Sequence, residues 1–254
     1  MIRAIVFDLG HTLWDILPGD GAALDRAYAS MRATLVARLG RDDLPDAAAL
    51  REAVRQALHE AGETYFQNPA RLEQPPSSRW VDQGCRSLGL RLDAALLDEV
   101  TPPLFATEID SLACADGTVG AVRALADRGY ALGCITNTLA DSAAIRAMLR
   151  RYEIEGLMRT VVVSSEEGWR KPHRSLFEKA LRGLSAAPRE AVFVGDSPAH
   201  DIAGAKAAGM YAVLTRQYAA RPYAGFEPAP DAVVAHLREL PQVIAAIDGR
   251  DQRG

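Results

Sequence analysis

The sequence has few of the features that would place it in a specialised class of protein. Its 254 residues include only three cysteines, Cys85, Cys114 and Cys134, which are odd in number and show no C-x-x-C spacing. This pattern disfavours both a disulfide framework and a zinc site. We interpret the three thiols as small buried side chains of a protein from a reduced compartment. Aromatic residues make up only 6% of the chain and give no indication of its function.

The chain also lacks an excess of charge and a long apolar run. Its 29 lysines and arginines are nearly balanced by 33 aspartates and glutamates, for a net charge of -4. No basic excess is left for binding nucleic acid or an anionic membrane. The apolar run at the start is interrupted by Asp8, and nothing of transmembrane or signal-peptide length follows. We therefore expect a cytoplasmic protein that binds neither nucleic acid nor a membrane.

What is present is a globular composition, with 48% hydrophobic and 24% charged residues. Short apolar, β-branched runs recur along the chain and predict strands that are buried on both faces. Helical patterns lie between these runs, and this alternation predicts an α/β fold with a doubly wound parallel sheet. The expected strands are 2–9, 131–136, 160–164, 191–195, 211–215 and 231–234, and the expected helices are 118–128, 142–152, 175–183 and 201–208.

Residues 14–105 break this alternation. They show four helical periodicities and no convincing strand. We therefore predict a smaller all-α domain at 14–105, inserted into an α/β core formed by 1–13 and 106–254. The connections near 13–20 and 106–116 would then act as a pair of hinges. The four expected helices are 21–39, 46–66, 78–88 and 93–104.

Polar residues follow several of the predicted strands. Asp8 ends the first strand, Thr136 and Asn137 end the second, and Asp196 follows the fourth. Ligands of open parallel sheets bind beyond the carboxyl ends of the strands. Two carboxylates there would form an oxygen-rich site that suits Mg²⁺. Asp8 could then attack a phosphorus atom as a covalent nucleophile, while Thr136, the main-chain amide of Asn137 and Lys171 bind the developing negative charge.

Four segments of the chain resemble, in order, the four motifs of the haloacid dehalogenase superfamily. They are IVFDLGHTL at 5–13, CITNT at 134–138, WRKPHRSLF at 169–177 and VFVGDSPAHDIAGAKAAGM at 192–210. The resemblance covers nearly the whole chain. It implies a Rossmann-like core, a helical cap that closes over the site, and a small phosphorylated metabolite as substrate. It also implies that Asp8 is the nucleophile, that Thr136, Asn137 and Lys171 bind the phosphoryl group, and that Asp196 binds Mg²⁺.

Four further residues near these motifs have alternative roles. Asp201 either returns a carboxylate to the water shell of the metal or caps the start of a helix. Ser197 is either a hydroxyl in the metal's outer shell or a turn residue. His11 and Trp14 follow the nucleophile closely enough to face the substrate.

The first motif departs from the family's phosphatase pattern, DxDxT, at Gly10. In that pattern the second Asp protonates the leaving group. Gly10 can still offer its main-chain carbonyl to the metal, as family members do at this position, but it supplies no acid. Losing a general acid typically costs a hundred- to ten-thousand-fold in rate, as an order of magnitude. Either another group replaces this acid, with His11, a residue of the insertion and metal-bound water as candidates, or the reaction does not need it.

The sequence leaves three functions open. The first is Mg²⁺-dependent phosphomonoester hydrolysis through an aspartyl-phosphate on Asp8, which the GDSPAHD motif favours because it resembles the metal-binding phosphatase form. The second is hydrolysis of a carbon–halogen bond without a metal, since dehalogenases of the family also lack the second Asp. The third is a phosphate-binding or regulatory module with little turnover. A monomer and a homodimer are both compatible with the sequence.

Overall fold

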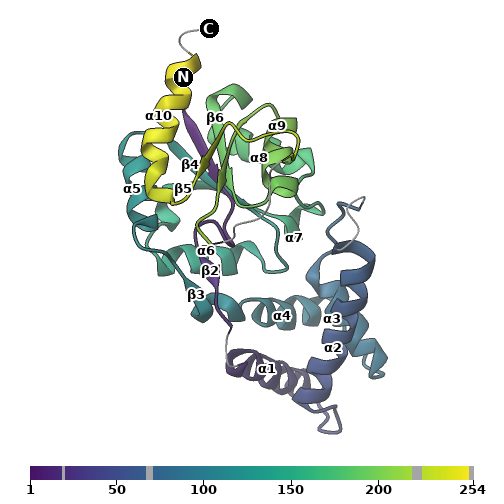
Figure 1. Cartoon of the computed structure of the whole chain (residues 1–254). Helices are drawn as coiled ribbons and strands as arrows, with labels where there is room; N and C mark the ends of the chain where they lie inside the picture. The colour runs from purple at the N-terminus through teal and green to yellow at the C-terminus, as the bar shows by residue number, and fades with distance from the viewer. Residues whose placement is uncertain (19–20, 67–70, 219–224, 252–254) are drawn as a thin grey trace.

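The core of the molecule is a parallel sheet of six strands. The computed structural model describes residues 1–18, 21–66, 71–218 and 225–251. The strand order is β5-β4-β1-β6-β7-β8, so the first strand lies between the fourth and the sixth (Figure 1). The predicted α/β fold is therefore confirmed. The strands are β1 (Ala4–Phe7), β4 (Ala131–Thr136), β5 (Met158–Val163), β6 (Ala191–Gly195), β7 (Tyr211–Thr215) and β8 (Ala232–Val234).

Helices cover both faces of this sheet because its central strands are apolar throughout. All four residues of β1 are buried. Ile5 and Phe7 pack with α5, α6 and α10 on one face, while Ala4 and Val6 pack with α8 and α9 on the other. Alternation of side chains along a strand produces this division. The helices are α5 (Thr118–Asp127), α6 (Ser142–Arg151), the short α7 (Ser164–Glu167), α8 (Arg174–Leu184), α9 (Ala203–Ala207) and α10 (Leu240–Asp251).

Four helices lie together outside the sheet, as the lower part of Figure 1 shows. We call them the inserted helices. They share a hydrophobic cluster that is separate from the two clusters flanking the sheet. Asp46 and Asp93 cap two of them by accepting the N–H groups of Ala49 and Leu96, each at 2.8 Å. The four predicted helices are confirmed; the division into two domains at 14 and 105 stays a prediction. Their bounds are α1 (Ala22–Leu39), α2 (Ala47–Ala61), α3 (Ser77–Ser87) and α4 (Ala94–Phe105), with a π-helical turn Gly62–Phe66 after α2.

A two-stranded antiparallel pair joins the inserted helices to the sheet. It consists of β2 (Asp15–Ile16) and β3 (Leu112–Ala113), with Asp15 opposite Ala113 and Ile16 opposite Leu112. The expectation that residues 14–105 contain no strand is therefore wrong for β2. Two residues are too few for a strand period to be visible in a sequence. The pair lies where we expected hinges, and their motion stays a prediction.

Other elements differ from expectation at their ends. The strand expected at 160–164 begins two residues earlier, at Met158, and Ser164 already starts α7. The first two residues of the helix expected at 201–208 belong to a π-helical segment, Pro198–Ile202, and α9 begins only at Ala203. Helix α10 was not predicted. Among the described residues, no helix is both long and apolar enough to cross a bilayer.

The three thiols are free. Cys85 and Cys134 are buried, and Cys114 is half-buried. Cys114 donates from Sγ to the carbonyl of Leu13 at 3.2 Å. The interpretation of Cys85 and Cys134 as buried side chains is confirmed.

Candidate active site

Three adjacent strands bring the candidate residues together. Strand β1 pairs with β4 on one side and β6 on the other, so Asp8, Thr136 and Asp196 emerge at one edge of the sheet. The Asp8 N–H donates to the carbonyl of Val194 at 2.9 Å, which continues the hydrogen-bond ladder between β1 and β6 to Asp8. Here the strand order reverses, and such reversals are the usual ligand sites of open α/β sheets. A cavity of about 650 Å³ lies here, and its lining includes Asp8, Gly10, His11, Trp14, Thr136, Asn137, Lys171, Asp196, Ser197 and Asp201.

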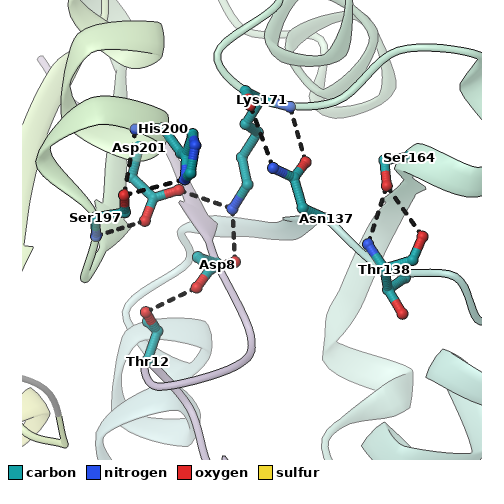
Figure 2. A network of polar contacts seen from close by, with 9 residues as sticks. All are labelled: Asp8, Thr12, Asn137, Thr138, Ser164, Lys171, Ser197, His200 and Asp201. Atoms are coloured by element: carbon teal, nitrogen blue, oxygen red, sulfur yellow. Dashed lines mark hydrogen bonds and ion pairs between the residues drawn. The ribbon is translucent and has the colours of Figure 1, made fainter. Parts of the chain in front are cut away.

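Lys171 lies at the centre of the charged groups in this cavity. Its Nζ donates to Asp8 Oδ1 at 2.6 Å and forms an ion pair with Asp201 Oδ1 at 2.7 Å (Figure 2). All three side chains are buried. Burial alone would lower the pKa of Lys171, but the charges of Asp201 and Asp8 outweigh it and raise the pKa. The ammonium therefore stays charged at neutral pH.

The pKa of Asp8 is shifted by the same surroundings. Burial raises it, the Lys171 ammonium opposes this shift, and the Asp201 carboxylate adds to it. A further carboxylate, Asp196, is buried beside them. The site thus holds three carboxylates around one ammonium, an arrangement that favours binding of another cation.

The three carboxylates are placed to hold a metal ion. Asp8, Asp196 and Asp201 each offer an oxygen, and these oxygens lie within 4.8 Å of one another. Asp201 Oδ1 has its ion-pair contact with Lys171 but no hydrogen bond of acceptable geometry, which leaves a buried lone pair to be satisfied. An all-oxygen donor set suits a hard divalent cation. The residues present therefore fit such an ion.

Asp201 is not a helix cap. Its Oδ2 accepts the N–H of Ser197 at 2.9 Å, while Ser197 itself caps the π-helical segment by accepting the N–H of His200 at 3.3 Å. The capping alternative for Asp201 is therefore wrong. Ser197 caps this turn, and a further role of its hydroxyl in the metal's outer shell stays a prediction. Gly195 makes room for this arrangement, since a Cβ there would lie 2.4 Å from Asp201 Oδ2.

Asn137 and Thr12 position the two central groups. The side chain of Asn137 forms a reciprocal pair with the backbone of Lys171, accepting its N–H at 2.7 Å and donating to its carbonyl at 3.2 Å. Thr12, which is fully buried, donates from Oγ1 to Asp8 Oδ2 at 3.1 Å (Figure 2). Neither contact was predicted from the sequence. The threonine of the DxDxT pattern was the available signal for Thr12.

The residues that follow Asp8 form part of the cavity wall. His11 has a positive φ of 55°, and its Nδ1 lies 2.9 Å from Asp15 Oδ1. Trp14 is only 2% exposed and stacks on Tyr152 with ring centroids 5.8 Å apart. Trp14 is thus a packed wall residue. At Gly10 a Cβ would meet nothing within 4 Å, so a side chain can be accommodated there.

Residues 2–209 match the protein-family model of haloacid dehalogenase-like hydrolases. The chain belongs to this family. The resemblance seen in the four motifs is confirmed, and so is the prediction that the protein is a hydrolase.

Relatives of this haloacid dehalogenase-like hydrolase include proteins named as phosphatases. The chain is 29% identical to glyceraldehyde 3-phosphate phosphatase of Methanopyrus kandleri over 96% of its own length and 97% of that protein. It is 37% identical to phosphoserine phosphatase of Thermus thermophilus, but over only 44% of each chain.

The similar solved structures include a dehalogenase and a phosphatase. The 2-haloacid dehalogenase from Pseudomonas syringae pv. Tomato DC3000 has a TM-score of 0.63 and 26% identity, covering 97% of this chain and 99% of that one. The haloacid dehalogenase-type phosphatase from Thermococcus onnurineus has a TM-score of 0.57 and 22% identity, covering 96% and 98%. The second likeness supports the shared fold alone.

The inserted helices supply a further wall of the cavity that the sequence analysis missed. Tyr28 of α1 and Arg51, Arg55 and Leu58 of α2 all line it. Trp80, in contrast, packs against the alanines of α2 and is not among the described lining residues.

Proposed function

We propose that this hydrolase is a Mg²⁺-dependent phosphatase of small phosphorylated metabolites that acts through an aspartyl-phosphate on Asp8. The observation that carries the proposal is the buried group of Asp8, Lys171, Asp196 and Asp201 at the reversal point of the sheet. Two relatives named as phosphatases of small phosphorylated compounds support it. In this proposal the inserted helices act as a cap over the site.

The metal would be held by the carboxylates of Asp8 and Asp196 and the carbonyl of Gly10, with Asp201 and Ser197 in its outer shell. Bound Mg²⁺ supplies positive charge that offsets repulsion between these carboxylates and the phosphate. This charge is needed because Asp8 and the substrate are both anionic.

In the first step, a carboxylate oxygen of Asp8 forms a bond to phosphorus as the bond to the ester oxygen breaks. The hydrogen bond from Thr12 holds the Asp8 carboxylate in one orientation. The ammonium of Lys171, the hydroxyl of Thr136 and the main-chain N–H of Asn137 donate to the phosphoryl oxygens. The reciprocal pair between Asn137 and the Lys171 backbone keeps these donors in register.

In the second step, water attacks the phosphorus of the aspartyl-phosphate, which releases inorganic phosphate and regenerates Asp8. The alcohol leaves with a proton in the first step, and Gly10 has no side chain to supply it. Among the replacements considered above, His11 lies in the cavity and is held by Asp15.

Carbon–halogen hydrolysis is the second candidate function. The 26% identity to a 2-haloacid dehalogenase over nearly the whole chain favours it, together with Gly10. The group of three carboxylates favours the phosphatase, because a metal-free dehalogenase has no use for a cation site.

A panel of phosphorylated sugars, hydroxy acids and nucleotides, assayed with Mg²⁺ and with EDTA, tests the proposal. We expect Mg²⁺-dependent phosphate release that Asp8→Asn abolishes while the circular dichroism spectrum is kept. Halide release from a 2-haloacid, without phosphate release from any ester, would reject the phosphatase. If neither phosphate nor halide is released but the protein still binds phosphate, the result would favour the phosphate-binding or regulatory module with little turnover.

A further inference from the structure

The wall that the inserted helices give to the cavity carries a basic group. Helix α1 contributes Leu24 and Tyr28, and α2 contributes Arg51, Arg55 and Leu58. Positions 51, 55 and 58 are spaced by four and three residues, so they lie on one face of α2. Two arginines one helical turn apart therefore contribute to the cavity wall.

Each arginine of this wall pairs with a carboxylate that lies outside the described cavity lining. Arg51 pairs with Asp25, and Arg55 pairs with Glu52 through Nε at 2.7 Å. Both carboxylates are largely exposed, and neither is among the described residues that line the cavity. Exposed ion pairs of this kind contribute little energy. A ligand anion inside the cavity can thus bind both guanidinium groups.

Tyr28 adds a hydrogen-bond donor beside Arg51. Its side chain is 5% exposed and lines the cavity. Burial raises the pKa of Tyr28 to about 12, although the nearby charge of Arg51 opposes the shift. The hydroxyl stays neutral and able to donate. A neutral tyrosine hydroxyl in a cavity wall can donate to an oxygen of a ligand.

Apolar side chains also line the cavity. They come from both parts of the chain and include Leu58, Leu104, Phe105, Ile145 and Met148. The cavity thus offers a phosphate site at the strand ends, carbon-lined walls, and a basic group on the inserted helices. Its volume of about 650 Å³ is that of a site for a small molecule.

We propose that the substrate is a phosphomonoester with a second anionic group, separated from the phosphate by a short carbon chain, and that Arg51, Arg55 and Tyr28 bind this group. This inference rests on the proposed phosphatase function. The second anion is a carboxylate or a second phosphate, since either can accept from guanidinium groups and a tyrosine hydroxyl. Arg51 is then a specificity-determining residue.

A matched pair of substrates tests this inference. One is an ω-phosphooxy carboxylic acid, and the other is its primary amide, which has the same length but no second charge. We expect the protein to prefer the acid in kcat/KM by about 10- to 100-fold, the range for a hydrogen bond to a charged group. Arg51→Gln should bring the ratio of acid to amide towards one, chiefly through KM, and Arg51→Lys should restore part of it. A bisphosphate of the same length shows which anion is preferred.

Arg86→Gln is the matched control, because Arg86 is another ion-paired arginine of the inserted helices that is not among the described lining residues. It should leave the ratio unchanged. Equal kcat/KM for acid and amide in the unaltered protein would overturn the inference while leaving the phosphatase in place. An equal fall of the ratio in Arg86→Gln and Arg51→Gln would also overturn it.

A binding measurement tests the site for the second anionic group independently of the proposed phosphatase function. Calorimetry on Asp8→Asn compares the Kd of the acid and the amide without turnover, alone and combined with Arg51→Gln. A tenfold preference for the acid that the second substitution removes supports the inference even if no ester is hydrolysed. Equal Kd values for acid and amide would reject it.

Discussion

At the scale of single residues, the site is a buried cluster in which each charged group depends on the others. Lys171 is in contact with both Asp8 and Asp201, and Asp196 lies nearby. Removing one partner of a buried ion pair leaves an uncompensated charge in a medium that solvates it poorly. These residues are therefore coupled in stability as well as in chemistry.

Gly10→Asp is the residue-scale prediction. A Cβ at Gly10 meets no atom within 4 Å, and its φ lies outside the left-handed region, so the side chain fits without strain. If the missing acid limits the rate, kcat for alkyl phosphates should rise about a hundredfold, the low end of general acid catalysis. The measurement is kcat for an alkyl ester and for p-nitrophenyl phosphate, whose leaving group needs no proton.

The ester comparison supplies the control for Gly10→Asp. A rise confined to the alkyl ester identifies proton transfer as the missing step. An unchanged rate for the alkyl ester would mean that another group already protonates the leaving group.

The residues at the strand ends could be predicted because their signal is local. Asp8 and Thr136 each terminate a buried apolar run, and parallel strands bring such ends to one edge. Tyr28 and Arg51 could not be predicted. Helical periodicity identifies the face that packs into a shared core, but not which flank of a helix faces a distant sheet.

At the scale of elements, the inserted helices depend on one close approach. Gly84 of α3 lies against α2, where a Cβ would be 2.8 Å from the backbone N of Val54. Only a glycine allows the two helices this spacing. The sequence shows a glycine within a helical pattern but not the partner that requires it.

Gly84→Ala should therefore destabilise the protein. The methyl group forces α2 and α3 apart, and overpacking of this kind costs about 1–3 kcal/mol. Urea denaturation followed by circular dichroism measures the change. The control is Gly120→Ala in α5, where a Cβ meets nothing within 4 Å and a helical alanine gains about 0.5–1 kcal/mol. Equal effects of the two substitutions would contradict close packing as the cause.

The order of elements could be predicted well, and the short elements could not. Strands β4, β6 and β7 begin and end where their apolar runs do. The pair β2–β3 and the π-helical segment Pro198–Ile202 were missed. Each is defined by contacts with other parts of the chain, such as the hydrogen bond from the Ser197 N–H to Asp201, and these leave no periodic pattern.

At the scale of the whole molecule, the three clustered carboxylates make folding sensitive to divalent cations. The native state brings Asp8, Asp196 and Asp201 together, while the unfolded chain separates them. A cation that binds only the native state stabilises it by about 2.7 kcal/mol at a hundred times its Kd.

We therefore expect Mg²⁺ to raise the Tm and EDTA to reverse the rise. Differential scanning calorimetry with and without Mg²⁺ measures this. Asp196→Asn should abolish the shift, whereas Asp231→Asn, a carboxylate that pairs with Lys206 away from the cavity, should keep it. An equal Mg²⁺ shift in both variants would contradict a metal site at the strand ends.

The antiparallel pair β2–β3 brings the two ends of the helical insertion side by side. The chain therefore leaves the core and re-enters it at nearly the same point, whatever lies between. A different set of helices could be exchanged at this point without altering the path of the sheet. The proposed substrate-binding wall and the proposed catalytic residues can thus change independently in evolution.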